Sequence, residues 1–121
     1  MANKLLVIMV NTDPERGLEV APPLLQATVA ATMEYDVEVV LSGQAGRLAV
    51  RGYAEGVTIR EGGKTAYDLI REAHAAGVSL KVTTTAVESW GRDLIAEVSD
   101  IVGGAYIVSE AMDDDTVAFT Y

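Results

Sequence analysis

Apolar residues form short runs at several places along this chain, in the manner of buried strands. Residues 4–10 (KLLVIMV) are a continuous apolar run, which is typical of a strand covered on both faces of a parallel sheet. In residues 78–82, apolar positions alternate with Ser79 and Lys81, the spacing of a strand with two different faces. The predicted strands cover residues 4–10, 36–41, 78–82, 104–108 and 116–121.

Helix signals lie between these runs. Asp13 before Pro14 has the composition of a helix start, but Pro22 and Pro23 predict that a short turn comes first and the main helix begins near Pro22. Its apolar residues extend around most of the circumference, so we expect a well-buried helix. A short helix is predicted over residues 46–50, and Thr65 with Asp68 predicts a helix ending before Gly77. Thr85 with Glu88 predicts a last helix from about Ala86 to Ser99.

Strands that alternate with helices indicate βαβ units and therefore an α/β fold with a mainly parallel sheet. At 121 residues the chain has the size of one domain, spanning residues 1–121, with neither an internal repeat nor a linker. Residues 52–63 (GYAEGVTIREGG) form a long connection, a kind of loop that often contributes to binding or to subunit contacts.

Composition narrows the possible partners and chemistry. The net charge of −9, from 18 acidic and 9 basic residues, disfavours nucleic acid and anionic membranes as partners. The chain has no cysteine, which excludes disulfides, zinc–thiolate sites and cysteine nucleophiles. The first apolar run is too short for a signal peptide or a membrane span, so we expect a cytoplasmic protein.

The most informative stretch is GVSLKVTTTAVESWG, residues 77–91, because a strand here runs directly into a helix start. In open α/β sheets, ligands bind at the carboxyl ends of strands, where helix N-termini present free N–H groups. Polar residues at the predicted strand ends, and one nearby arginine, are therefore the candidate ligand-binding set. They are Asn11, Thr12, Ser42, Gly43, Arg47, Thr83, Thr84 and Thr85.

No catalytic residue, metal site or cofactor emerges from the motifs. A threonine needs an adjacent base or a free amino terminus to act as a nucleophile, and neither accompanies Thr83. His74 is the only histidine, and residues 113–115 (DDD) lack calcium-loop spacing, so a packing role and a solvated turn are favoured. Trp90 is favoured as a packing or oligomer-contact residue. The glycines match no dinucleotide or phosphate-loop pattern.

With these features in place, the chain resembles the DsrE/DsrF-like family of small sulfur-trafficking α/β proteins over nearly its whole length. The resemblance is carried by the first strand leading into NTDPERG, by the segment APPLLQATVAATMEYDVEVVLSGQAGRLAVRG, by HAAGVSLKVTTTAVE and EVSDIVGG, and by a final strand ending in Phe119. It implies a three-layer α/β/α domain around a five-stranded, mainly parallel sheet. It also implies a homo-oligomer (trimer or hexamer), or a hetero-oligomer with a cysteine-bearing relative.

The resemblance also implies where the chain departs from the family. Members that carry sulfur hold it as a persulfide on a cysteine at the end of the third strand, and that position falls on Thr83. Persulfide transfer needs a thiolate, and a hydroxyl with a pKa well above about 10 cannot replace it. We therefore expect a non-catalytic, oligomeric binding or accessory subunit linked to sulfur metabolism. The alternative is an enzyme or a protein that binds a small anion or small molecule at the pocket around Thr83.

Overall fold

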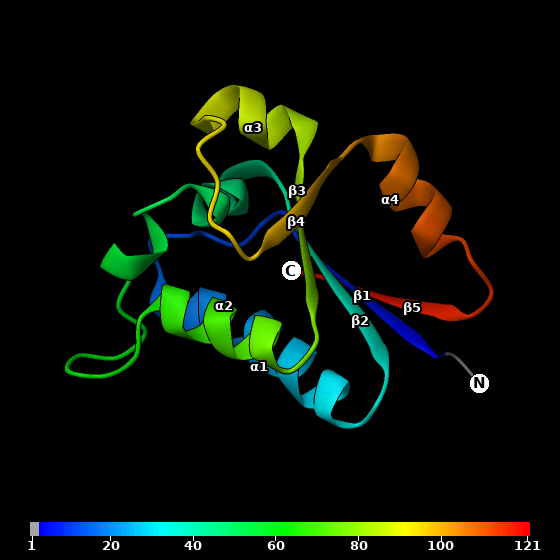
Figure 1. Cartoon of the computed structure of the whole chain (residues 1–121), viewed down its shortest axis with the longest axis horizontal. Coiled ribbons are helices and arrows are strands. Elements are labelled where there is room, and N and C mark those ends of the chain that lie inside the picture. Colours follow the sequence, from blue (N-terminus) through cyan, green and yellow to red (C-terminus); the bar gives the residue numbers. More distant parts are fainter. Residues whose placement is uncertain (1–2) are drawn as a thin grey trace.

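The computed structural model describes residues 3–121 and confirms the predicted α/β class. Its five strands form one parallel sheet in the order β4-β3-β2-β1-β5 (Figure 1). The strands are β1 (Lys4–Met9), β2 (Asp36–Leu41), β3 (Ser79–Thr83), β4 (Val98–Val102) and β5 (Thr116–Thr120). In chain order, β1 to β4 are added side by side, and the chain then crosses back to place β5 next to β1.

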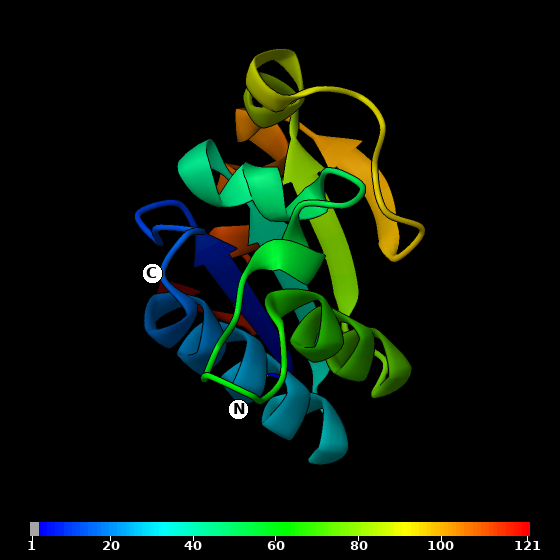
Figure 2. The ribbon, with the colours of Figure 1, turned by 90° about the vertical axis from the view of Figure 1, so that its left-hand side faces the viewer.

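Helices cover both faces of the sheet and complete a three-layer α/β/α arrangement. The helices are α1 (Gly17–Thr32), α2 (Ala66–Ala75), α3 (Thr84–Trp90) and α4 (Gly104–Ala111), with 3-10 segments η1 (Gly43–Ala49) and η2 (Ala54–Gly56). Helices α1 and α2 lie side by side on one face (Figure 2), and α4 packs on the other. None of the helices in residues 3–121 has the length and apolar character needed to cross a bilayer.

The face under α1 and α2 is a dry apolar core. Val7, Val39 and Leu80 from the central strands pack there against Leu24 of α1 and Ile70 of α2, and all five are fully buried. Burial of this kind of surface is the main force that holds an α/β domain together. The core therefore fixes β1, β2 and β3, and with them the positions of their carboxyl ends.

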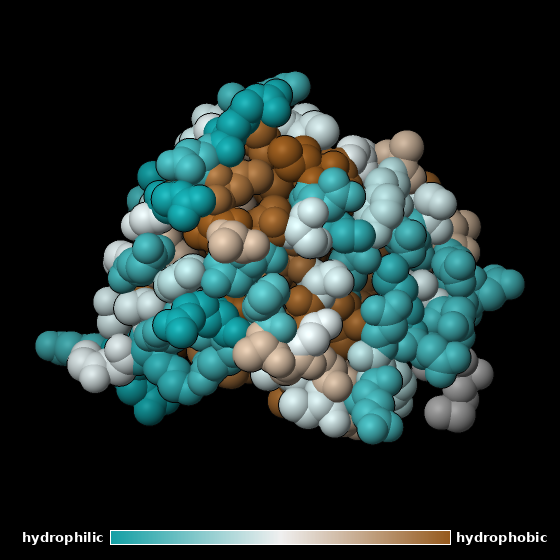
Figure 3. Space-filling model, in the orientation of Figure 1, coloured by the Kyte–Doolittle hydropathy of each residue, from teal (hydrophilic) through white to brown (hydrophobic). Residues whose placement is uncertain are grey.

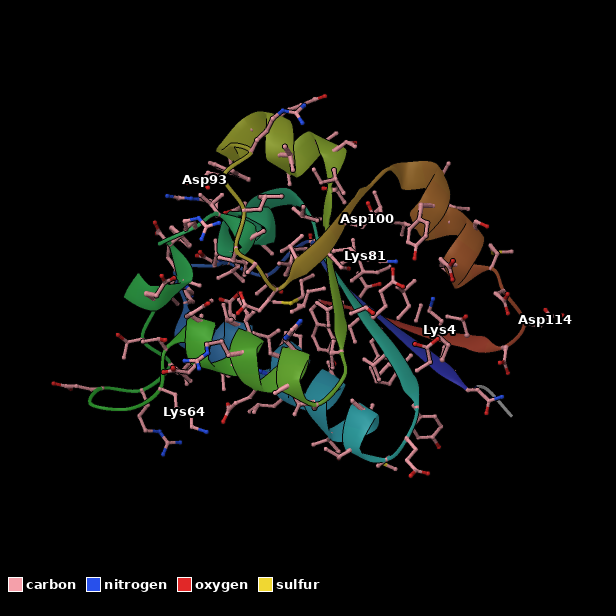
Figure 4. The ribbon with its side chains drawn as sticks, viewed as in Figure 1. Lys4, Lys64, Lys81, Asp93, Asp100 and Asp114 are labelled. Carbon is pink, nitrogen blue, oxygen red and sulfur yellow. The ribbon has the colours of Figure 1, made fainter. Side chains whose placement is uncertain are left out.

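The face under α4 has a charged cluster at its centre instead. The Glu38 carboxylate is 4% exposed and accepts hydrogen bonds from Lys4 at 3.1 Å and from the Tyr106 hydroxyl at 2.7 Å. Lys81 lies 3.4 Å from the same carboxylate, and Lys4 also bonds Glu110 at 2.8 Å. Figure 4 shows Lys4 and Lys81 on this side of the sheet, with Lys64 and Asp114 at the periphery. Burial alone would lower the pKa of Lys4, but its two carboxylate partners outweigh burial and raise it.

The structure corrects the predicted start of the first helix. Helix α1 begins at Gly17 and continues through both prolines, whereas we expected it to begin near Pro22. Asp13 does not cap a helix: its side chain accepts a bond from the Glu15 amide at 3.0 Å and forms a turn. Pro22 and Pro23 lack an N–H, so the helix loses only the bonds to the carbonyls of Leu18 and Glu19, two exposed residues of its first turn.

The structure also corrects the region after β3. Helix α3 ends at Trp90, because Gly91 adopts a φ of 120° that L residues rarely take, so the predicted continuation to Ser99 is wrong. Residues 98–102 form the edge strand β4, and residues 104–111 form α4 where a strand was expected. Short apolar runs occur in both helices and strands, and residues 98–102 form a strand because they pair with β3.

Other local predictions are confirmed. Thr65 and Asp68 form a reciprocal capping box at the start of α2. Gly77 follows α2 with a φ of 102°, as expected of a glycine that ends a helix. The strand at residues 36–41 has the predicted bounds.

Candidate functional site

The end of β3 lies at the point of the sheet where the chain changes sides. After β3 the chain enters α3, whose Ala86 and Val87 belong to the same core as α1 and α2. After the neighbouring strand β4 it enters α4, which packs on the opposite face. Adjacent strands whose connections leave to opposite faces create the crevice where open α/β sheets bind ligands. Thr83, the last residue of β3, is therefore at the position where a ligand is expected.

Thr83 is buried at this position and its hydroxyl is already engaged. It is 5% exposed, and its Oγ1 accepts a bond from the Ala86 amide at 3.4 Å, which makes it the N-cap of α3. The same Oγ1 lies 3.5 Å from the hydroxyls of Ser42 and Thr85. The predicted capping residue was Thr85, so α3 begins two residues earlier than expected. The hydrogen bonds of Thr83 thus join hydroxyl and amide groups, none of which is a base.

Arg47 lies in a second group beside this one, held between two aromatic rings. Its guanidinium carbon is 4.4 Å from the centroid of the Tyr53 ring and 5.0 Å from that of Trp90. The Trp90 indole donates a 2.9 Å hydrogen bond to the carbonyl of Gly43, and Glu15 lies 3.8 Å from the guanidinium. Burial raises the pKa of the Tyr53 hydroxyl, although Arg47 opposes this effect. Stacking of this kind orders the guanidinium and keeps part of it open to solvent.

The eight predicted site residues therefore lie in more than one group. Ser42, Thr83 and Thr85 are in contact, and Gly43 and Arg47 are joined through Trp90. Asn11 is exposed just beyond the end of β1, and its backbone N–H donates a hydrogen bond to the Tyr121 carbonyl at 2.8 Å. Thr12 is buried and Thr84 is exposed.

The remaining polar candidates lie away from this site. His74 is on the exposed side of α2, next to a shallow hollow that also includes Lys64 and Glu97. Asp113 accepts a bond from the Asp115 amide at 2.8 Å, so the acidic segment forms a turn. Within residues 3–121, no group of three or more acidic or histidine side chains is arranged to hold a metal ion.

Sequence reasoning missed an apolar groove between α1 and the edge strand β5. The groove has a volume of about 450 Å³, and its lining includes Leu25 and Val29 from α1, Met33 at the C-cap of α1, and Val117 and Phe119 from β5. All five are between 43% and 62% exposed. The signal that could have found it is the apolar composition of α1 on every side, since one sheet face can bury only one side of a helix.

The opposite side of the molecule differs in character. Figure 3 shows a largely hydrophilic surface over α2, with hydrophobic surface gathered between α3 and β4. A hollow along β4 includes Leu94, Val98 and Ile101, but Asp100 and Ser99 also line it. It is therefore smaller and more polar than the groove beside α1.

Comparison with known proteins gives matches among solved structures. No family model matches the chain, and no curated protein sequence matches it closely enough to be significant. Among solved structures, the chain is similar to the crystal structure of the ychN protein from E. coli, with a TM-score of 0.77 over 100% of both chains and 18% sequence identity. The ychN protein has a DsrE-like fold, and at this identity the likeness concerns the fold alone. The chain therefore shares the three-layer α/β/α fold of the ychN protein.

Proposed function

We propose that this chain is a non-catalytic DsrE-like protein that acts as a binding or accessory subunit in sulfur metabolism. It assembles as a homo-oligomer (a trimer or a hexamer) or with a cysteine-bearing relative. The observation that carries the proposal is the state of Thr83. This residue ends β3 at the crevice between opposite connections, yet its hydroxyl is buried and caps α3.

The chemistry of a hydroxyl supports the absence of sulfur transfer. A sulfur carrier must attack a sulfane sulfur as a thiolate and then be attacked at its own terminal sulfur. A threonine hydroxyl stays protonated near neutral pH unless a base takes its proton. The groups that bond Thr83 are Ser42, Thr85 and the Ala86 amide, and none of them can do so.

A turnover assay tests this proposal. The purified chain is incubated with thiosulfate and cyanide, and thiocyanate formation is measured against a buffer blank. We expect no thiocyanate above the blank at any concentration of the chain. Thiocyanate formed in proportion to the concentration of purified chain would contradict the proposal.

A second candidate function is favoured by Arg47. Its guanidinium is ordered by Tyr53 and Trp90, and within residues 3–121 its one acidic partner is the exposed Glu15, at 3.8 Å. A small anion such as phosphate, sulfate or thiosulfate could replace this weak partner. Segment η1, which carries Arg47, packs against α3, whose first turn includes Thr85.

Thermal shift measurements separate the two candidates. Anion binding at this site predicts that one anion of a panel raises the melting temperature, and that Arg47→Ala and Thr83→Val abolish the rise. His74→Ala lies on α2 and serves as the control that should keep it. If no anion stabilises the chain, or if His74→Ala abolishes the effect as well, binding at Arg47 and Thr83 is excluded.

A further inference from the structure

One side of the molecule presents apolar side chains that no other part of residues 3–121 covers. On α1 and its C-cap, Leu18, Leu25, Val29 and Met33 follow one another at spacings of seven, four and four residues and are between 49% and 80% exposed. This spacing places them in one stripe along the helix, on the seam positions through which helices pack on each other. Beside the stripe, Val117 and Phe119 of β5 form the other wall of the groove. These six residues define the α1–β5 face.

The α1–β5 face is also nearly free of charge in a strongly acidic chain. Between Gly17 and Met33 the only charged residue is Glu19, and β5 has none; the one charged residue that lines the groove is Lys4. By contrast, the ten residues of α2 include Asp68, Arg71 and Glu72. Two copies of a chain with net charge −9 repel each other over most of their surfaces. On the α1–β5 face this repulsion is weakest and the gain from burying apolar surface is largest.

Strand β5 lacks the features that usually keep an edge strand from associating. Edge strands are commonly protected by lysine, proline or a covering helix. The sequence of β5, TVAFT, contains neither residue type, and four of its five residues are exposed. At the other edge of the sheet, β4 carries an exposed Asp100. The β5 edge is therefore the one suited to a contact with another chain.

We infer that the α1–β5 face is the contact surface between two copies of this chain, related by a two-fold axis, with α1 of each copy along the groove of the other. Such an interface requires one patch that is complementary to itself. The α1–β5 face meets this requirement, because it contains both a ridge, the α1 stripe, and a groove of about 450 Å³ beside it. The inference rests on the hexamer included in the proposed function, because a hexamer can have two-fold axes and a trimer has none. It names the surface that forms the two-fold contact.

Sedimentation analysis of matched valine variants tests the inference. Val29 is 57% exposed on α1 and Val108 is 63% exposed on α4, so Val29→Glu and Val108→Glu add the same charge on different faces. We expect the wild-type chain and Val108→Glu to sediment as an even number of 12.8 kDa chains. We expect Val29→Glu to be monomeric, with association weakened on the order of 100-fold. Unchanged circular dichroism shows that each variant is folded.

Three outcomes would overturn the inference. The first is a wild-type monomer at a chain concentration of about 100 μM, where dimers of ordinary affinity form. The second is a wild-type trimer, which has no two-fold axis. The third is a Val29→Glu variant that associates like the wild type. A wild-type monomer that binds an apolar dye, with binding lost in Val29→Glu, would instead identify the groove as a site for an apolar ligand.

A site-specific label provides a second measurement. The chain has no cysteine, so Gln26→Cys in the groove and Ser109→Cys on α4 each accept a single nitroxide. We expect the label at position 26 to lose mobility as the chain concentration rises, while the label at position 109 keeps it. Equal mobility of both labels at all concentrations would contradict the inference. Neither measurement depends on sulfur chemistry, so its failure leaves the thiocyanate assay as a separate test of the proposed function.

Discussion

The end of β3 and the α1–β5 face differ in how the rest of the chain contacts them: the polar group at the first is hydrogen-bonded, and the apolar groups at the second remain exposed. At the end of β3, Thr83 is polar and buried, and its hydroxyl is bonded to the α3 amide and to neighbouring hydroxyls. On the α1–β5 face, Val29 and Phe119 are apolar and exposed, and nothing in residues 3–121 covers them. The first region occupies the usual ligand position of the fold but is satisfied without a ligand. The second is in no conventional site, yet it is the region that gains most from a partner.

This difference indicates which physical property should respond to mutation in each region. Changes at the end of β3 should alter the stability of the monomer and leave association intact. Changes on the α1–β5 face should alter association and leave the fold intact. Stability and association are therefore measured separately for each variant.

The largest effect is expected from Gly46→Ala, next to the end of β3. A Cβ atom at Gly46 would overlap the Cβ atom of Ala86, so η1 and α3 would have to move apart. We expect the free energy of unfolding to fall by about 2–3 kcal/mol, the upper part of the usual range for overpacking, with the subunit association unchanged. Chemical denaturation measures the fall. Gly56→Ala is the control, because a Cβ atom there meets nothing within 4 Å; equal stability losses in both variants would show that close packing at Gly46 is not the cause.

A somewhat smaller effect is expected on association from Phe119→Ala. Aromatic residues in the middle of an interface often contribute about 2 kcal/mol, so self-association should weaken on the order of 30-fold. Sedimentation at several concentrations measures this change. Met112→Ala at the C-cap of α4, where the side chain is 77% exposed, should associate like the wild type. A Phe119→Ala variant with wild-type association would remove β5 from the interface.

The smallest effect is expected from Thr83→Val, which keeps the shape of the side chain but removes the cap of α3. Loss of such a cap typically costs about 1 kcal/mol, and we expect this decrease in the free energy of unfolding with no change in association. Thr83→Ser retains the hydroxyl and should retain most of the stability. If Thr83→Val were as stable as the wild type, the 3.4 Å bond to the Ala86 amide would not be a stabilising cap.

Much of the fold could be predicted because its central strands are long apolar runs with clear boundaries. The runs at residues 4–10 and 36–41 form the inner strands β1 (Lys4–Met9) and β2 (Asp36–Leu41), and the Thr65 capping box marks a helix start through local chemistry alone. The order of β4 and α4 could not be predicted, because GAYIV and VSDIV are too short to separate helix from strand. The register of β4 with β3 decides it, and that contact is not visible in the local pattern.

The candidate site was predictable only in part, for a similar reason. Strand-end positions follow from the strand pattern, so Ser42, Thr83 and Thr85 could be expected to meet. Which side of α1 remains uncovered depends on how far the sheet extends beneath it, and β5 is a single edge strand there. The apolar pattern of α1 therefore predicted a buried helix, whereas Leu25, Val29 and Met33 lie in the open groove.

The central claim is that the fold presents the position of a sulfur carrier without the atom that carries sulfur. Its most direct test is the intact mass of the native wild-type chain and of Thr83→Cys after treatment with polysulfide. The account predicts that the wild-type mass stays unchanged and that Thr83→Cys gains a sulfur atom that a thiol reductant removes. A stable sulfur adduct on the wild-type chain, or a native Thr83→Cys that remains unmodified while its denatured form reacts, would contradict it.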